Sequence, residues 1–202
     1  MPYNDALQHY YRLLKIWNDK INLIAPQQLV SFDYFHHHHL KDCLWLAVSI
    51  KKNLPNLSNN FSLIDLGSGN GLPAIPLAMV FQNPVVMIEK INKKGVFLKT
   101  ILAELNLSGQ VITKPIETGL KNAIIAHQPK FLTARALLPL KHLLPLLSPI
   151  IPNHLSIYLL KSKNFQIEWQ ATSQHDRRGW QITKIDENNT GKVIIKLDYD
   201  NK

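Results

Sequence analysis

A glycine-rich segment that starts with an acidic residue is the strongest chemical signal in the sequence. Residues 65–71 read Asp-Leu-Gly-Ser-Gly-Asn-Gly and follow a short apolar run at 61–66. Glycine lacks a Cβ and tolerates positive φ, so such a turn lets a flat or extended ligand approach the backbone and the N-terminus of a following helix. Open α/β sheets bind their ligands at this place. The segment therefore predicts a ligand-binding loop.

The spacing of the glycines narrows the class of ligand. A dinucleotide fold would carry Gly-x-Gly-x-x-Gly, whereas residues 67–71 carry Gly-x-Gly-x-Gly, with an acid two residues before the first glycine. This pattern resembles the first motif of class I S-adenosylmethionine-dependent methyltransferases, in which the loop wraps the methionine part of the cofactor. A tight turn without a ligand and a nicotinamide-binding loop are the alternatives.

A second acidic residue supports the methyltransferase interpretation. In that class, a carboxylate at the end of the second strand accepts hydrogen bonds from the ribose hydroxyls, and Glu89 stands at that place. A carboxylate offers two acceptor oxygens to a vicinal diol, and charged acceptors make the stronger hydrogen bonds. The loop, its predicted strand and Glu89 together predict an S-adenosylmethionine site.

A narrower resemblance covers most of the chain. Residues 65–78 are similar to the RsmG (GidB) methyltransferases, which modify guanine N7 in the 16S RNA of the bacterial small ribosomal subunit. Further motifs stand in the order of that family: Trp17-Asn18, Asn22-Leu23, His39-Leu40-Lys41-Asp42, Glu89, Lys93-Lys94, Phe97-Leu98, Ile116-Glu117, Thr133-Ala134-Arg135-Ala136 and Leu159-Leu160-Lys161. Several motifs in order are more specific than one loop.

The resemblance implies a set of cofactor contacts and a smaller catalytic set. The cofactor contacts are Asp65, Gly67, Gly69, Gly71, Leu72, Glu89, Ile116, Glu117 and Arg135. Among them, Ile116 and Glu117 are expected beside the adenine. The catalytic residues are Arg135 and Lys161. The sequence departs from the family pattern at Ile24, Ala74, Pro115 and Ser162, and the change at Ser162 bears on the loop near the target base.

The chemistry of methyl transfer agrees with what the sequence lacks. The reaction is an in-line displacement that gains chiefly from alignment and the exclusion of water. Guanine N7 carries a free lone pair and no proton, so its attack needs no general base. An Asn-Pro-Pro-Tyr type motif for exocyclic amines is absent, and so is a cysteine on a sheet-end loop that could attack a pyrimidine. These absences favour N7.

Arg135 is expected at the carboxyl end of a strand. Its guanidinium could bind the carboxylate of the cofactor, an RNA phosphate or guanine O6. Bidentate contact with O6 and N7 would block the nucleophile, so a contact to O6 or phosphate only is the hypothesis. A surface salt bridge is the alternative without a function.

Other polar residues give weaker signals. Phosphate contacts could come from Lys93, Lys94, Lys161, Lys163, Arg177 and Arg178, and for each a solvated surface charge is at least as good an interpretation. A helix would put only His36 and His39 of the four histidines at 36–39 on one face, and no tetrahedral set is completed there, so no metal site is expected. His39 is expected to pack with Asp42, and Trp17 and Cys43 to lie in the core.

Short apolar runs alternate with helical patterns along most of the chain. Strands are expected at 61–66, 85–89, 111–113, 131–133 and 155–160, and helices at 73–81, 93–105 and 140–147. This alternation predicts a parallel sheet. A short polar loop between 180–185 and 192–197 predicts an antiparallel hairpin. The expected fold class is α/β, a Rossmann-like class I methyltransferase with a seven-stranded, mostly parallel sheet, a closing hairpin and a small N-terminal helical extension.

The first sixty residues are expected to be helical. Apolar residues recur at Leu7, Tyr10, Leu14 and Trp17, and again at Leu40, Leu44 and Val48. Turn-forming residues at 51–60 place a boundary between an N-terminal extension, 1–59, and an S-adenosylmethionine-binding domain, 60–202.

Composition limits the remaining choices. The chain has 202 residues, one cysteine and a net charge of +9, which attracts polyanions. The expected partner is 16S ribosomal RNA or the small subunit, with no membrane and no obligatory protein partner. We expect a cytoplasmic enzyme, because no signal or transmembrane segment is visible. The alternatives are a methyltransferase for another RNA or a small molecule, a nicotinamide-dependent oxidoreductase and a non-catalytic RNA-binding module.

Overall fold

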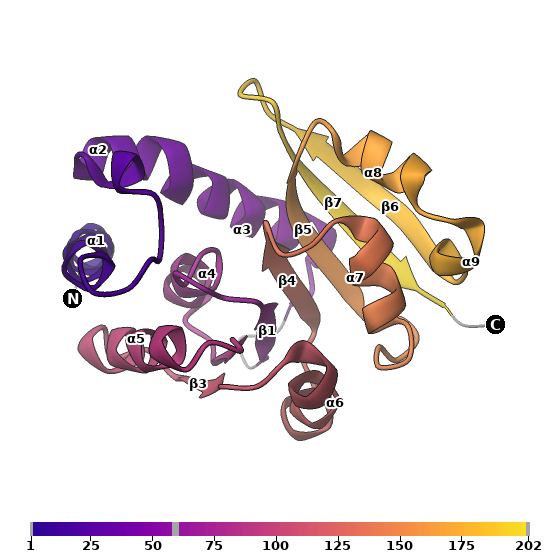
Figure 1. Ribbon diagram of the computed structural model, residues 1–202, viewed down its shortest axis with the longest axis horizontal. Coiled ribbons are helices and arrows are strands. Elements are labelled where there is room, and N and C mark those ends of the chain that lie inside the picture. Colours follow the sequence, from indigo (N-terminus) through magenta and orange to yellow (C-terminus); the bar gives the residue numbers. More distant parts are fainter. Residues whose placement is uncertain (1, 58–60, 201–202) are drawn as a thin grey trace.

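The computed structural model describes residues 2–57 and 61–200, which form a sheet between two layers of helices (Figure 1). The seven strands lie in the order β3-β2-β1-β4-β5-β7-β6. They are β1 Leu63–Leu66, β2 Val85–Ile88, β3 Gly109–Ile112, β4 Phe131–Arg135, β5 Ser156–Ser162, β6 Trp180–Glu187 and β7 Lys192–Tyr199. Strands β1 to β5 run parallel, and β7 runs antiparallel to β5 and β6. The predicted fold class is confirmed.

One layer of helices packs on the first face of the sheet. It consists of α1 Tyr3–Asn18, η1 Pro26–Leu29, α2 Phe32–Phe35, the π-helical turn η2 His36–Leu40, α3 Lys41–Asn53, α4 Ala74–Phe81 and α5 Asn92–Glu104. Its buried side chains form one core with Leu63, Met87 and Phe131 of the strands. The N-terminal helices therefore share a core with the sheet.

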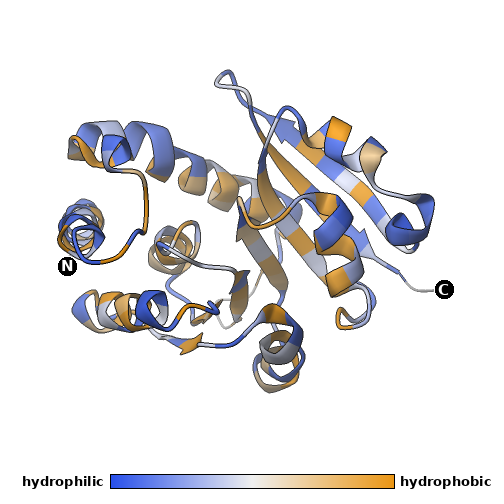
Figure 2. Cartoon of the chain, in the orientation of Figure 1, coloured by the Kyte–Doolittle hydropathy of each residue, from blue (hydrophilic) through white to orange (hydrophobic). Residues whose placement is uncertain are grey.

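The other layer covers the second face. It consists of α6 Ile116–His127, α7 Leu140–Leu147, α8 Phe165–Ala171 and α9 Gln174–Arg177. Because side chains alternate along a strand, Ile64, Leu66 and Ile88 point to this side. Figure 2 shows the apolar residues gathered where the helices of both layers meet the strands.

The order of the strands decides where a ligand can bind. The connection after β1 leads to β2 on one side, whereas β4 pairs with β1 on the other. Asp65 pairs with Thr133, and Leu66 with Ala134, in this central pair. Ligands of open α/β sheets bind outside the carboxyl ends of the strands at such a switch point. The glycine loop after β1 and the end of β4 meet there.

Three details of the predicted elements need correction. Helices α6, α8 and α9 were not expected, and α3 extends through Asn53 into the segment predicted as turns. In α3 the buried face is Cys43, Leu46, Ala47 and Ile50, whereas Val48 is 49% exposed. A repeat of four residues advances about 40° beyond each helical turn, so the predicted stripe drifts off the buried face by Val48. Cys43 is fully buried, and Trp17 packs partly buried against Phe97, as expected.

The proposed boundary near residue 60 falls partly outside the described residues, since 58–60 are not among them. The division into 1–59 and 60–202 remains a prediction. Within residues 2–57 and 61–200, no helix combines the length and the apolar character that crossing a membrane requires.

Candidate cofactor and target site

The glycine loop has the left-handed backbone that the sequence predicts. The φ angles of Gly67, Gly69 and Gly71 are +65°, +51° and +89°. The positive φ favours glycine at position 67, and a Cβ there would also displace the tip of the Leu137 side chain in the segment after β4. The N–H groups of Gly67 and Ser68 donate to Ile88 O at 2.8 and 3.1 Å. The loop is thereby attached to the end of β2.

Glu89 follows β2 and holds the loop from the side. Its Oε2 accepts a hydrogen bond from Gly69 N at 2.9 Å, and its Oε1 accepts one from Ile91 N at 2.8 Å. The residue is 6% exposed. Each carboxylate oxygen can accept more than one hydrogen bond, so Glu89 can also bind a ligand hydroxyl.

A cavity of about 420 Å³ opens beside the loop. Five of the predicted cofactor residues line it: Gly67, Gly69, Glu89, Ile116 and Glu117. The last two stand at the N-terminus of α6, after the end of β3. The structure thus brings the glycine loop, the acid after β2 and the start of α6 together around one space, which we call the cofactor cavity. Gly71 and Leu72 do not line it.

Asp65 lies apart from this cavity, on the first face of the sheet. It is 1% exposed, and its Oδ1 accepts a hydrogen bond from Thr133 Oγ1 at 2.7 Å. The buried Oδ2 has no partner among the described residues. Burial chiefly, and the nearby Glu89 in addition, raise the pKa of this carboxyl to about 7, against the lowering effect of hydrogen bonds from Ser68 and Thr133. Asp65 therefore holds an unused acceptor.

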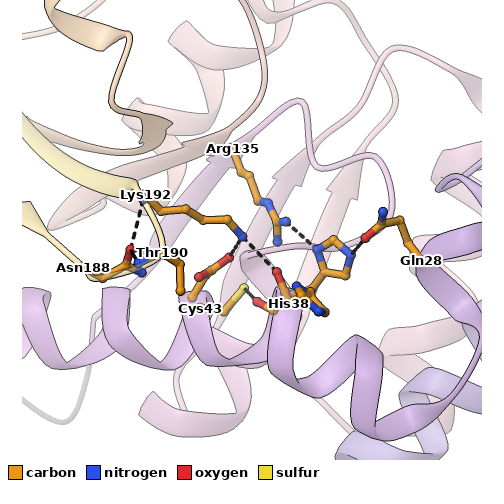
Figure 3. Close-up of polar contacts among 9 residues, drawn as sticks. Gln28, His38, Cys43, Arg135, Asn188, Thr190 and Lys192 are labelled. Atoms are coloured by element: carbon orange, nitrogen blue, oxygen red, sulfur yellow. Dashed lines mark hydrogen bonds and ion pairs between the residues drawn. The ribbon is translucent and has the colours of Figure 1, made fainter.

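Arg135 ends β4 two residues after Thr133, so its side chain is on the same face of the sheet as Asp65. Its Nη2 donates to His39 Nδ1 at 2.7 Å, whereas its buried Nη1 has no partner among the described residues (Figure 3). Arg135 is half-buried and forms no salt bridge with a described carboxylate. An unused acceptor and an unused donor thus lie at the ends of two neighbouring strands.

His39 is expected to pack with Asp42, but the polar partners of the two residues are different ones. His39 lies between Arg135 and Gln28, whose Oε1 is 2.8 Å from His39 Nε2. Asp42 instead forms an ion pair with Lys192, which also donates to His38 O at 2.9 Å (Figure 3). Burial, and then the charge of Arg135, lower the pKa of His39 to about 4. A neutral His39 accepts from Arg135 and donates to Gln28, which fixes the direction of the guanidinium.

Metal binding and thiol chemistry are the other reactions that the side chains of this region could support. In the part of the chain that the structure describes, no three His, Cys, Asp or Glu side chains are grouped as a metal site. The thiol of Cys43 is buried, and burial raises its pKa to about 12. A thiol with this pKa stays protonated and is not a nucleophile.

A second cavity, of about 430 Å³, lies on the other side of the segment after β4. Lys161 and Glu168 line it together with Arg135, Asp42 and Lys192. Lys161 Nζ is 2.6 Å from Glu168 Oε2 and donates to Leu138 O at 3.0 Å. Lys161 is therefore paired with an acid at this cavity, and its place near a target base remains a prediction.

Residues 136–138 form a wall that both cavities share. Ala136 has a φ of +48°, an uncommon conformation for a residue with a Cβ. This turn directs the chain from β4 across the glycine loop, where Leu137 covers Gly67. We call the second space the target cavity.

Sequence reasoning missed several residues of the two cavities. Leu137, Leu138, Glu168 and Lys192 line one or both of them. A polar residue in a short helix and a lysine that begins a strand carry no local signal. Of the predicted phosphate contacts, Lys94 lines the cofactor cavity and Lys161 the target cavity, whereas the others line neither.

Comparison with known proteins decides the family. A model named GidB, for rRNA small subunit methyltransferase G, matches residues 3–192. The chain belongs to this family. It is therefore an S-adenosylmethionine-dependent methyltransferase, and the predicted resemblance, enzyme class and cofactor are confirmed.

Curated relatives in this family match nearly the whole chain. Ribosomal RNA small subunit methyltransferase G of Paracoccus denitrificans is 35% identical over 184 residues, which cover 88% of this chain and 84% of the relative. The protein of the same name from Gluconobacter oxydans is 33% identical over 196 residues, which cover 97% of this chain and 94% of the relative.

Solved structures show the same fold at low identity. An RNA methyltransferase from Salinibacter ruber in complex with S-adenosyl-L-homocysteine has a TM-score of 0.57 and 15% identity, covering 78% of this chain and 92% of that one. MtNAS in complex with MTA and tNA has a TM-score of 0.66 and 11% identity, covering 96% of this chain and 71% of that one. At such low sequence identity, these matches show only that the fold is shared.

The departures from the GidB family pattern have identifiable places. Pro115 lines the cofactor cavity before α6, and Ser162 ends β5 at the target cavity. Ala74 begins α4 and is fully buried. Ile24 donates its backbone N–H to Asn18 Oδ1 at 3.0 Å, a contact that any residue except proline can make.

Proposed function

We propose that this chain methylates N7 of a guanine in 16S ribosomal RNA and that it works in the cytoplasm. The observation that carries the proposal is the wall of residues 136–138, because it brings a cofactor cavity and a target cavity to the same strand end. S-adenosylmethionine supplies an activated methyl group on a sulfonium. The chain binds and orients the two reactants and excludes water.

The charges in the target cavity suit a nucleophile that carries no proton. Its two carboxylates are both paired with lysines, Asp42 with Lys192 and Glu168 with Lys161. Each carboxylate that lines this cavity is thus engaged by an ammonium group, and none of those described there is unpaired. Attack by a protonated amine would need a base, whereas guanine N7 offers a lone pair directly.

The unpartnered atoms of Asp65 and Arg135 fit the amino-acid end of S-adenosylmethionine. Asp65 Oδ2 would accept from an α-ammonium, and Arg135 Nη1 would donate to an α-carboxylate. A buried polar atom without a partner costs roughly 1–3 kcal/mol, and a zwitterion would satisfy both atoms at once. We assign Arg135 to the cofactor carboxylate for this reason.

The nucleoside end fits the cofactor cavity. Glu89 would accept from the ribose hydroxyls while it keeps its bonds to Gly69 and Ile91. Ile116 offers an apolar contact to the adenine, and the carboxylate of Glu117 an acceptor for its amino group.

A methyl-transfer assay tests the proposed function. Small subunits from cells that lack the gene are incubated with the purified chain and tritiated S-adenosylmethionine. Incorporation of label is expected, together with chain cleavage at a guanine after borohydride and aniline treatment, which is specific for N7-methylguanosine. Label on an exocyclic amine, or none in either naked 16S RNA or subunits, contradicts the proposal.

The raised pKa of Asp65 predicts that cofactor binding depends on pH. In the free protein this carboxyl has a pKa of about 7, and a neighbouring ammonium would lower it. Binding therefore releases a proton, and affinity for S-adenosylhomocysteine rises by about tenfold per pH unit below pH 7 and levels off above it. Calorimetry between pH 5.5 and 8.5 measures this slope.

Asp65→Asn is the matched control for this dependence. Its affinity is expected to be lower at pH 8 and nearly flat with pH. If the affinity of Asp65→Asn rises as steeply with pH as that of the wild type, another group titrates.

The stability of the free wild-type protein follows the same linkage. The contribution of Asp65 to the free energy of unfolding is present below its unfolded pKa of 3.8 and is lost as the pH rises to about 7.

A further inference from the structure

The Lys161–Glu168 pair has hydrogen-bonding capacity left over. Glu168 Oε2 accepts from Lys161 Nζ at 2.6 Å and from Leu140 N at 3.2 Å. No described residue donates to the other oxygen, Oε1. Lys161 uses two of its three protons, on Glu168 and on Leu138 O. The side chains are 10% and 28% exposed, so both are held largely out of water at the target cavity.

We propose that Glu168 recognises the target base as guanine, with Lys161 as its partner. This inference rests on the proposed function, since it names how the same cavity selects its substrate. Adenine also carries a free N7, so N7 chemistry alone does not choose between the purines. The choice must come from the 6, 1 and 2 positions, where guanine presents O6, N1–H and a 2-amino group.

The unused hydrogen-bonding groups of Lys161 and Glu168 match O6, N1–H and the 2-amino group of guanine. The third proton of Lys161 meets O6, and Glu168 Oε1 meets the N1–H and 2-amino donors. Adenine would place its 6-amino group against the ammonium and its N1 lone pair against the carboxylate, so both contacts would repel it. Enzymes that act on a base extruded from the stack commonly read its Watson–Crick edge in this way.

The positions of Lys161 and Glu168 would also orient the base so that N7 faces the methyl donor. Lys161 lies on β5 and Glu168 on the following helix α8, whereas the wall shared with the cofactor cavity follows β4. On a purine, N7 and the N1 edge lie on opposite sides of position 6. A guanine whose N1 edge meets Glu168 therefore turns N7 toward residues 136–138 and the methyl donor.

Backbone contacts hold the Lys161–Glu168 pair in place, so little side-chain entropy is lost when the base binds. Leu140 N belongs to the first turn of α7 and Leu138 O to the wall itself. These contacts tie the recognising pair to the segment between the two cavities. The charge of Lys161 also offsets that of Glu168, so the acid does not repel RNA phosphates.

The test compares guanine with inosine at the target position of reconstituted small subunits. Inosine keeps N7, O6 and N1–H and lacks only the 2-amino group. Wild-type kcat/KM for guanine is expected to exceed that for inosine by about 10- to 100-fold, the effect of one hydrogen bond to a charged acceptor. This comparison needs no variant. Equal rates on the two bases would overturn the proposal.

Glu168→Gln then assigns the discrimination to this residue. The amide turns a donor toward the guanine donors, so the ratio of guanine to inosine is expected to fall to near one. Glu104→Gln makes the same chemical change at an acid outside both cavities, where it pairs with His9 of α1, and should keep the wild-type ratio. Affinity for S-adenosylhomocysteine and the thermal midpoint show that both variants are folded.

The outcomes separate this inference from the proposed function. A Glu168→Gln enzyme that binds S-adenosylhomocysteine and still discriminates as wild type does would remove Glu168 from base recognition. Guanine and inosine that are methylated at N7 equally well leave the proposed function standing and overturn the inference alone. A wild-type chain that methylates no guanine N7 overturns the proposed function first.

Discussion

Arg135→Ala is expected to abolish methyl transfer and to weaken binding of S-adenosylhomocysteine by about 100-fold or more. The guanidinium is oriented by neutral His39, and its buried Nη1 has no partner among the described residues, on the same face of the sheet as the unused oxygen of Asp65. Loss of a desolvated, charge-assisted contact costs roughly 2–5 kcal/mol, part of which comes from the ligand carboxylate that is left unpaired. Equilibrium binding and the tritium assay measure the two effects.

5′-Methylthioadenosine separates this role from a general loss of structure. The compound has the nucleoside and the sulfur but lacks the amino-acid end, so its affinity for Arg135→Ala should equal its affinity for the wild type. Arg12→Ala, on the exposed side of α1, serves as the charge-matched control and should bind both compounds normally. Wild-type turnover by Arg135→Ala would remove the residue from the mechanism.

Glu89→Ala is expected to lower the affinity for both compounds by about 100-fold. The carboxylate accepts from Gly69 N and Ile91 N and is proposed to bind the ribose diol, so the change removes a ligand contact and leaves two loop N–H groups without their acceptor. Each lost contact with a charged acceptor is worth roughly 1.5–3 kcal/mol. The free energy of unfolding should fall as well, because the loop loses its attachment.

Glu89→Gln distinguishes the ribose contact from the loop contacts. The amide keeps one acceptor oxygen, so part of the loop attachment and part of the affinity should remain. The two sites should differ in which affinities they change. Arg135→Ala should lower the affinity for S-adenosylhomocysteine only, whereas Glu89→Ala should lower the affinity for both S-adenosylhomocysteine and methylthioadenosine. A Glu89→Ala protein that binds methylthioadenosine as the wild type does would contradict the ribose assignment.

The signals for the cofactor loop and for the strands of the sheet are local in the sequence. The glycine loop, Glu89 and the alternation of strands and helices are properties of short segments, since glycine φ angles, strand period and turn residues act over a few positions. The sheet with its hairpin was therefore predictable, and Gly67, Gly69, Glu89, Ile116 and Glu117 do meet at one cavity. Helix α8 was missed because seven residues offer little periodicity.

The sequence alone determined the cofactor loop, the acid beside it and the order of elements that brings them to one edge of the sheet. Only the tertiary structure decided the partners of the charged side chains. Arg135 meets His39 rather than a carboxylate, Asp42 meets Lys192, and Lys161 meets Glu168. Two of these pairs join residues 96 and 150 positions apart. Such a pairing depends on how whole layers pack, and a hydrophobic period specifies which face of a helix is buried without specifying which polar groups face each other across the contact.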